Sequence, residues 1–240
     1  AAAFAIETAL WDVWAQRRSM PLACVWGAPA DARVSTAMLV DVLSPDDWPS
    51  SPPAVVKMKV GRPGRWDEEL SSLRQWHARF ADATVRLDAN RAFGPEAPAR
   101  LHDLHQLQKR GLDIDFLEEP TPWPWPVTSL PLAQDESLRK GVLCEGMAAA
   151  VVKPTVLGGL AAGDRWRADG HRVVMSHTFE GPVAHAALSA WALAFAPNET
   201  AGLGPHAGVF GWRDVVVDHV EGERLRVPSR PGLGLLMEAS

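Results

Sequence analysis

The chain of 240 residues contains no tyrosine and only two cysteines, Cys24 and Cys144. The cysteines lack CxxC spacing, so they indicate neither a disulfide framework nor a thiolate metal site, and we expect a cytoplasmic protein. No apolar run approaches the roughly 20 residues that cross a bilayer, and AAAFAIETALWD lacks the basic region of a signal peptide. Basic residues are not in excess, since 24 Lys and Arg against 29 Asp and Glu give a net charge of −5. We therefore predict neither a nucleic-acid nor a membrane partner.

Segments typical of strands alternate with segments typical of helices along most of the chain, which indicates parallel βα units. Strands are predicted at 34–43, 55–60, 84–89, 114–118, 132–135, 149–154, 172–176 and 202–204. Helices are predicted at 1–18, 68–80, 96–110, 137–147, 160–169 and 183–195. Eight strands with intervening helices favour a closed (β/α)8 barrel of the TIM type over residues 1–213, although periodicity alone also allows an open doubly wound sheet. Residues 214–240 are predicted to form a separate C-terminal segment of short strands and turns.

Two lysines lie two residues apart in the second predicted strand, Lys57 and Lys59 of VVKMKVG. Side chains at this spacing on a strand share one face, so the two ammonium groups would share a small site. Each charge disfavours protonation of the other, which predicts that one lysine serves as a proton acceptor. The alternative is a solvated edge strand with two surface lysines, which the flanking valines weaken.

Carboxylates end the next three predicted strands: Asp88 in VRLDAN, Glu118 in DFLEEP and Asp135 in LAQDES. The chemistry of such barrels lies where strands end, and three acids converging there suit a hard cation such as Mg²⁺, or Mn²⁺. An acid at a strand end is more often a helix N-cap than a ligand, and Asp135, with a helix beginning at Glu136 and Ser137, is a candidate for that role. The adjacent acids Glu119 and Glu136 are alternative ligands, but strand alternation would point them the other way.

A third lysine, Lys153 in AAAVVKPTVLGG, ends the sixth predicted strand. A buried lysine is costly unless it has a partner or a purpose. Lysines on the second and sixth strands of a barrel face each other across its mouth, which suits proton abstraction beside a carboxylate. His177, His185 and His206 are alternative general bases, but a loop histidine is more often a hydrogen-bonded structural residue.

The ordered set KMK, LDAN, LEEP, QDES and VKPTVLGG resembles the barrel domain of the enolase superfamily, muconate-lactonising subgroup. Within it, KPTVLGGL followed by SHTFEGPVAHAAL and AGLGP is most similar to the o-succinylbenzoate synthase family. The resemblance implies a Mg²⁺-dependent hydro-lyase that dehydrates 2-succinyl-6-hydroxy-2,4-cyclohexadiene-1-carboxylate to o-succinylbenzoate in menaquinone biosynthesis. The implied partner is this small carboxylate substrate, and the resemblance leaves the oligomeric state open.

Carried over by position, the resemblance makes Lys59 the base that removes the proton and then the acid that assists departure of hydroxide. Lys57 would tune Lys59 and neutralise charge, and Lys153 would face the ring as a cation. The metal ligands would be Asp88, Glu118 and Asp135. The residues expected to bind substrate are Asn90, Gly158, Gly159, Ser176 and Phe179, with a helix-capping role equally open for Asn90.

Members of this superfamily normally begin with an α+β capping domain that closes over the barrel, and we expect that domain to be missing from this chain. The chain would then be either a fragment or a reduced natural form. An N-succinylamino acid racemase or dipeptide epimerase is the alternative enzyme, because the same two lysines and metal support it. A catalytically silent barrel that acts as a binding partner is the alternative from another class.

Overall fold

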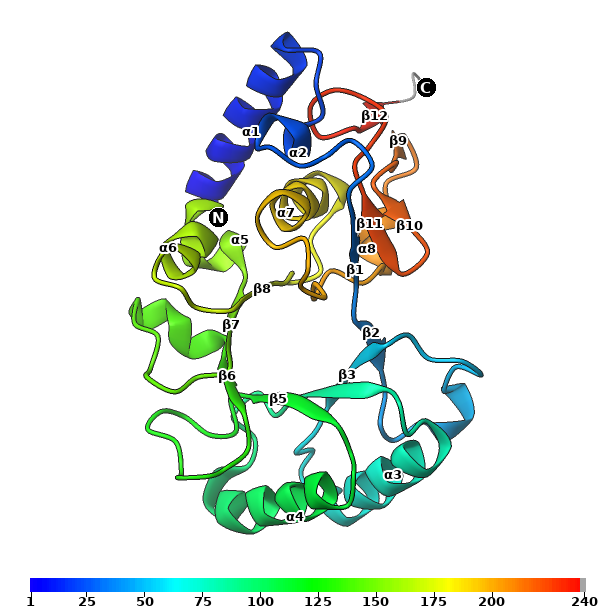
Figure 1. The fold of residues 1–240 in the computed structure, drawn as a ribbon, viewed down its shortest axis with the longest axis vertical. Helices are drawn as coiled ribbons and strands as arrows, with labels where there is room; N and C mark the ends of the chain where they lie inside the picture. Colours follow the sequence, from blue (N-terminus) through cyan, green and yellow to red (C-terminus); the bar gives the residue numbers. More distant parts are fainter. Residues whose placement is uncertain (238–240) are drawn as a thin grey trace. The chain divides into compact units, whose positions relative to one another are not determined.

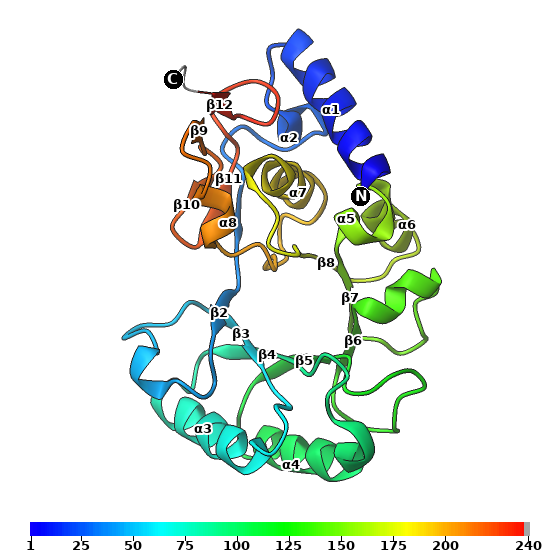
Figure 2. The same ribbon diagram turned by 180° about the vertical axis from the view of Figure 1, so that it is seen from behind.

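A computed structural model describes residues 1–237 of the chain. The chain divides into two compact units, one formed by Ala1–Thr36 with Val151–Ser240 and the other by Ala37–Ala150. Figures 1 and 2 show the elements of both units from opposite sides. Within residues 1–237, no helix combines the length and the apolar composition needed to cross a membrane.

The unit Ala37–Ala150 is built on a parallel sheet whose strands follow one another in chain order. The strands are β2 (Met38–Val40), β3 (Val55–Lys59), β4 (Thr84–Asp88), β5 (Ile114–Glu118), β6 (Leu132–Gln134) and the start of β7 (Ala149–Val152). Helices α3 (Trp66–Arg79) and α4 (Ala97–Lys109) cover one face of this sheet (Figure 1). Single turns of 3-10 helix lie at η1 (Pro45–Asp47), η2 (Gly94–Glu96) and η3 (Glu136–Lys140).

Alternation along the strands determines which face of this sheet is apolar. In β3, Val56 and Met58 are fully buried, whereas Lys57 and Lys59 between and after them belong to the other face. The buried valine and methionine join a core that includes Trp76 of α3. The core therefore lies between the sheet and α3 and α4, and the two lysines are on the opposite face.

The other unit contains the helices α1 (Ala2–Arg17), α2 (Leu22–Val25), α5 (Pro154–Leu157), α6 (Ala161–Ala168), α7 (Pro182–Phe195) and α8 (Ala207–Phe210). The end of β7 continues into this unit and is followed by β8 (Val173–Met175), with Ser176 N donating to Val152 O at 2.9 Å. Its short strands are β1 (Arg33–Ser35), β9 (Val215–Val216), β10 (Val220–Glu221), β11 (Arg224–Arg226) and β12 (Leu236–Met237). β11 pairs antiparallel with β1 and β10, and β12 with β9. Short strands are thus present between residues 215 and 237, and the predicted division of the chain after residue 213 stays a prediction.

Three predicted elements are wrong: the strand at 34–43, the helix at 137–147 and the strand at 202–204. The strand expected at 34–43 is interrupted after Ser35, because β1 pairs antiparallel with β11 whereas β2 pairs parallel with β3. The helix expected at 137–147 is only the short η3, because Gly141 and Gly146 take left-handed φ values of 74° and 78° that a helix does not tolerate.

The strand expected at 202–204 is reduced to isolated parallel bridges, Thr36 with Ala201 and Ser176 with Gly202. Glycines at 202 and 204 and Pro205, which has no N–H, weaken strand pairing there. The α/β class with parallel strands in chain order is confirmed. The eighth strand that the closed barrel requires is present, in the described part of the chain, only as these bridges.

Candidate active site

The strand register of the unit Ala37–Ala150 aligns the predicted site residues in one row. Lys59 pairs with Asp88, Asp88 pairs with Glu118, and Glu118 pairs with Ala133. Residues paired in this way point to the same face of the sheet, and Asp135 continues that face two residues after Ala133. These residues therefore lie at the ends of their strands, on the face of the sheet opposite α3 and α4.

The Lys57 ammonium bridges two of the predicted metal ligands. Its Nζ lies 2.9 Å from Asp88 Oδ2 and 2.7 Å from Glu118 Oε2. Burial disfavours the charged lysine, but the carboxylates of Glu118 and Asp88 outweigh it and raise the pKa of Lys57 above its usual range. The strand is not an edge strand, since β3 pairs with β2 and β4. Lys57 therefore stays protonated and acts as a fixed cation.

The three acidic residues lie largely out of solvent, with exposed fractions for the whole residue of 6% for Asp88, 1% for Glu118 and 5% for Asp135. Burial raises the pKa of Glu118 to about 7, and the charges of Asp88 and Asp135 add to this rise while Lys57 opposes it. One ammonium does not neutralise three clustered carboxylates. The electrostatics of the site therefore favour additional positive charge.

The donor chemistry of this cluster fits a hard divalent cation, because every carboxylate supplies oxygen. Two further oxygens beside it, Asn90 Oδ1 and Glu136 Oε2, are buried without a hydrogen-bond partner. Within residues 1–237, no three Asp, Glu, His or Cys side chains stand in the arrangement of a metal site. The group that bridges Asp88 and Glu118 in this structure is instead the Lys57 ammonium.

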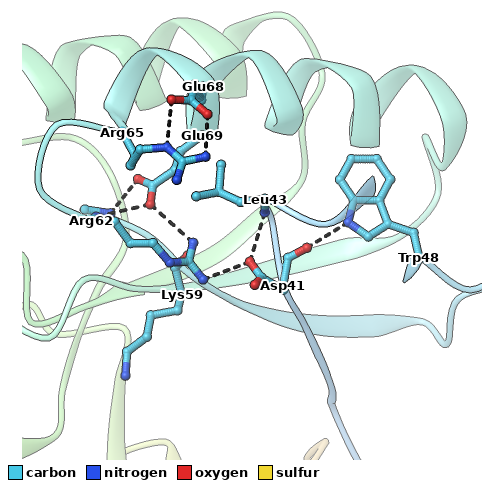
Figure 3. Close-up of polar contacts among 9 residues, drawn as sticks. Asp41, Leu43, Trp48, Lys59, Arg62, Arg65, Glu68 and Glu69 are labelled. Carbon is cyan, nitrogen blue, oxygen red and sulfur yellow. Dashed lines mark hydrogen bonds and ion pairs between the residues drawn. The ribbon is translucent and has the colours of Figure 1, made fainter. Parts of the chain in front are cut away.

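Lys59 extends from the end of β3 into solvent, away from a polar network that holds the following loop (Figure 3). Buried Glu69 of α3 accepts from Gly61 N at 2.6 Å and from Arg62 N at 3.1 Å. Arg62 also pairs with Asp41, at 2.8 Å between Nη2 and Oδ1. These contacts fix the chain directly after Lys59 and therefore the position from which this lysine projects.

The acids next to the predicted ligands make other hydrogen bonds, although one oxygen of Glu136 has no partner. Glu119 accepts hydrogen bonds from the backbone amides of Asp135 and Ser137, at 3.0 and 2.9 Å. Glu136 accepts from Asn90 Nδ2 at 3.0 Å. Asn90 caps no helix, since the residue before α4 is Glu96. These contacts favour the choice of Glu118 over Glu119.

The remaining predicted residues lie in the other unit. The roles of all the predicted site residues stay predictions. Lys153 directly follows β7 and precedes α5. The amides of Gly158 and Gly159 both donate to Pro154 O at 3.0 Å, so both are already used in ending α5. Ser176 is buried, whereas Phe179 is 63% exposed with a left-handed φ of 62°.

Hydrogen bonds favour a structural role for the histidines of this unit. His185 is fully buried, with Nδ1 2.9 Å from His219 Nε2 and Nε2 3.0 Å from Leu203 O. His177 Nδ1 accepts from Phe179 N, and His206 Nδ1 accepts from Gly208 N. His219 carries no sequence signal of this role, because it lies in the tail, outside any strand-end motif.

The fold and site define a class: a parallel α/β domain with lysines and carboxylates at the ends of successive strands. The family model described as "Enolase C-terminal domain-like" matches residues 53–240, and the chain belongs to this family. A comparison with curated proteins found no match.

Among solved structures, the chain is similar to a dipeptide epimerase from Methylococcus capsulatus complexed with Mg and the dipeptide L-Arg-D-Lys. The identity is 25% and the TM-score 0.77, covering 98% of this chain and 72% of that chain. The L-Ala-D/L-Glu epimerase from Bacillus subtilis is 18% identical with a TM-score of 0.78, covering 100% and 73%. A muconate lactonizing enzyme from Mycobacterium smegmatis is 19% identical with a TM-score of 0.76, covering 97% and 72%. The two likenesses below 25% identity show a shared fold.

Proposed function

We propose that the chain catalyses the metal-assisted removal of a proton from the carbon next to a carboxylate, with Mg²⁺ as the cofactor. The observation that carries this proposal is the row formed by Lys59, Asp88 and Glu118, with the Lys57 ammonium between the two carboxylates. Family membership supports it, as does the Mg complex of the similar epimerase from Methylococcus capsulatus.

Asp88, Glu118 and Asp135 would hold the cation. When bound, Mg²⁺ supplies positive charge that anchors a substrate carboxylate and stabilises the negative charge that develops on it. The partly buried Lys57 keeps two of these ligands in place, since its Nζ contacts both.

Proton transfer in this proposal falls to Lys59, which ends β3 beside Asp88 and is exposed to solvent. It takes the proton from the carbon next to the substrate carboxylate and can return a proton to a leaving group. Lys153 is proposed as the second lysine on its motif VKPTVLGG alone.

For the substrate, we propose 2-succinyl-6-hydroxy-2,4-cyclohexadiene-1-carboxylate. Loss of the proton next to the carboxylate and of the ring hydroxyl, which leaves as water, gives o-succinylbenzoate, an intermediate on the route to menaquinone. The support is the sequence resemblance of KPTVLGGL, SHTFEGPVAHAAL and AGLGP. Loops 158–160 and 176–181 carry the residues proposed to contact the succinyl chain.

Epimerisation of a dipeptide is the second candidate, favoured by the similarity to two dipeptide epimerases. In that reaction the proton removed on one face of the carbon is replaced on the other face, and no group leaves. The two candidates therefore share the metal site and differ in whether water is lost.

In the test, purified protein is incubated with Mg²⁺ and the cyclohexadiene substrate. In a separate reaction it is incubated in D₂O with L-Ala-L-Glu and a set of other dipeptides. Aromatic product is followed by absorbance, and deuterium uptake with inversion by NMR. A Lys59→Ala variant and an EDTA-treated sample are the controls. Aromatic product that both controls abolish supports the synthase, and deuterated, inverted dipeptide supports the epimerase. Metal binding without turnover of either substrate would contradict both and favour a catalytically silent binding partner.

A further inference from the structure

Glu119 connects three strand ends that carry the proposed metal ligands. It is fully buried and follows Glu118 directly, but its carboxylate belongs to the opposite side of the strand. Its contacts lie entirely within the unit Ala37–Ala150. None of these contacts reaches the Lys57 ammonium, so Glu119 has a role distinct from that of its neighbour.

One oxygen of Glu119 holds the segment that begins at Asp135. Oε1 accepts from Asp135 N at 3.0 Å, from Ser137 N at 2.9 Å and from the Ser137 hydroxyl. The backbone of Glu119 is also tied to β6, since its N–H donates to Ala133 O at 3.3 Å. Asp135 has a non-helical conformation at the start of η3, and these bonds fix the direction in which its side chain leaves the backbone.

The other oxygen of Glu119 holds the turn after Asp88. Oε2 accepts from Arg91 Nε at 2.9 Å, and Arg91 N donates to Glu119 O at 2.6 Å. The amide of Asn90, within this turn, donates to Asp88 Oδ1 at 3.0 Å. Glu119 therefore fixes the backbone that orients the Asp88 carboxylate.

The backbone at these junctions is strained. Asn90, Arg91 and Glu119 have φ values of 41°, 66° and 42°, in the left-handed region that residues other than glycine rarely adopt. Such a conformation persists only when the surrounding structure imposes it. Hydrogen bonds join these positions: Arg91 donates to both the side chain and the backbone oxygen of Glu119, and Asn90 N donates to Asp88 Oδ1.

We propose that Glu119 is a positioning residue that sets the geometry of Asp88, Glu118 and Asp135 for a divalent cation. This inference rests on the proposed function, because it requires that the three carboxylates bind metal. Residues that orient metal ligands in this way typically contribute about 10-fold to 100-fold to metal affinity.

The test measures Mn²⁺ affinity by calorimetry and by the electron paramagnetic resonance spectrum of the bound ion. In Glu119→Gln the amide oxygen can still accept from the two backbone N–H groups, but the amide nitrogen opposes the Arg91 N–H. We expect binding that is about 10-fold to 100-fold weaker, with an altered spectrum. The double variant Glu119→Gln/Arg91→Met removes the Arg91 N–H that would oppose the new amide nitrogen, and it should recover most of the lost Mn²⁺ affinity. Ser137→Ala, which removes one contact, should shift the affinity in the same direction by less.

The matched control is Glu96→Gln, which breaks another Glu–Arg pair of the same unit, that of Glu96 with Arg100, and should leave Mn²⁺ affinity unchanged. Thermal unfolding of each variant reports its fold. If wild-type protein binds no Mn²⁺, the proposed metal site is wrong. If wild-type protein binds and folded Glu119→Gln and Ser137→Ala bind equally tightly with the same spectrum, the positioning role of Glu119 is wrong. A Glu119→Gln loss that the double variant does not recover would also contradict the pairing with Arg91.

Discussion

Replacing Lys57 by methionine tests whether a single ammonium holds the carboxylate cluster together. The Nζ lies 2.9 Å from Asp88 and 2.7 Å from Glu118, and the side chains are only 18%, 9% and 2% exposed. At an effective dielectric constant of about 20, each contact has a gross Coulomb energy of about 6 kcal/mol, most of which desolvation offsets. Removing one partner of a buried pair leaves unpaired charge and typically costs about 3–5 kcal/mol. For a chain of this size, that predicts a fall in Tm of roughly 6–20 °C.

The assay is urea unfolding of wild type and Lys57→Met at pH 8 and pH 5, with and without Mg²⁺. The destabilisation should be largest at pH 8 and smaller at pH 5, because the carboxylates left without their cation take up protons as the pH falls. Mg²⁺ should restore part of the loss at pH 8 if the cluster binds it, since a cation then replaces the ammonium. Lys59→Met, at an exposed position, should change stability by no more than about 0.5 kcal/mol. A Lys57→Met effect below about 1 kcal/mol, or one independent of pH, would refute the electrostatic reasoning.

Two further predictions concern stability. Burial lowers the pKa of His185 to about 4 and that of His219 to about 3, so between pH 6.5 and 4 the unfolded chain binds protons that the folded chain does not. Urea unfolding from pH 7 to pH 4 should therefore show that wild type loses stability relative to the double variant His185→Gln/His219→Gln. His185 alone should account for a loss of up to about 3 kcal/mol. A difference in unfolding free energy between the two proteins that stays constant with pH would contradict this. In thermal unfolding, Gly61→Ala should lower the stability by about 1 kcal/mol more than Gly64→Ala does. Both glycines have a positive φ, but only at Gly61 would an added Cβ meet the ring of Phe93, at 3.0 Å. Equal costs would show that Phe93 moves aside.

Six parallel strands could be predicted from the sequence because each is an apolar run that turn residues bound on both sides. The interruption of the strand expected at 34–43 could not, since Thr36 and Ala37 carry no local signal for a break. It depends on pairing with Arg224–Arg226, nearly the whole chain away. By contrast, Gly141 and Gly146 were visible signals that the helix expected at 137–147 would not form.

The row of Lys59, Asp88 and Glu118 could be predicted because these residues end successive apolar strands, where the register of a parallel sheet brings such positions together. The contacts that hold them could not. Glu69 follows Asp67 and Glu68 in α3 and resembles any acid in the first turn of a helix. Only the fold buries it against the loop after β3. The bridging role of Lys57 likewise depends on side-chain geometry that spacing does not specify.

Glu118 and Glu119 show how one strand end gives two identical side chains different chemistry. Both are buried, yet Glu118 contacts an ammonium and is influenced by the charges of Asp88 and Asp135, whereas Glu119 contacts N–H groups and an arginine. Because side chains alternate along a strand, a register slip of one residue would exchange the two environments. The left-handed conformation of Glu119, followed by Pro120, which cannot donate a hydrogen bond, ends β5 at this point. The register of β5 therefore fixes which of the two carboxylates faces Lys57.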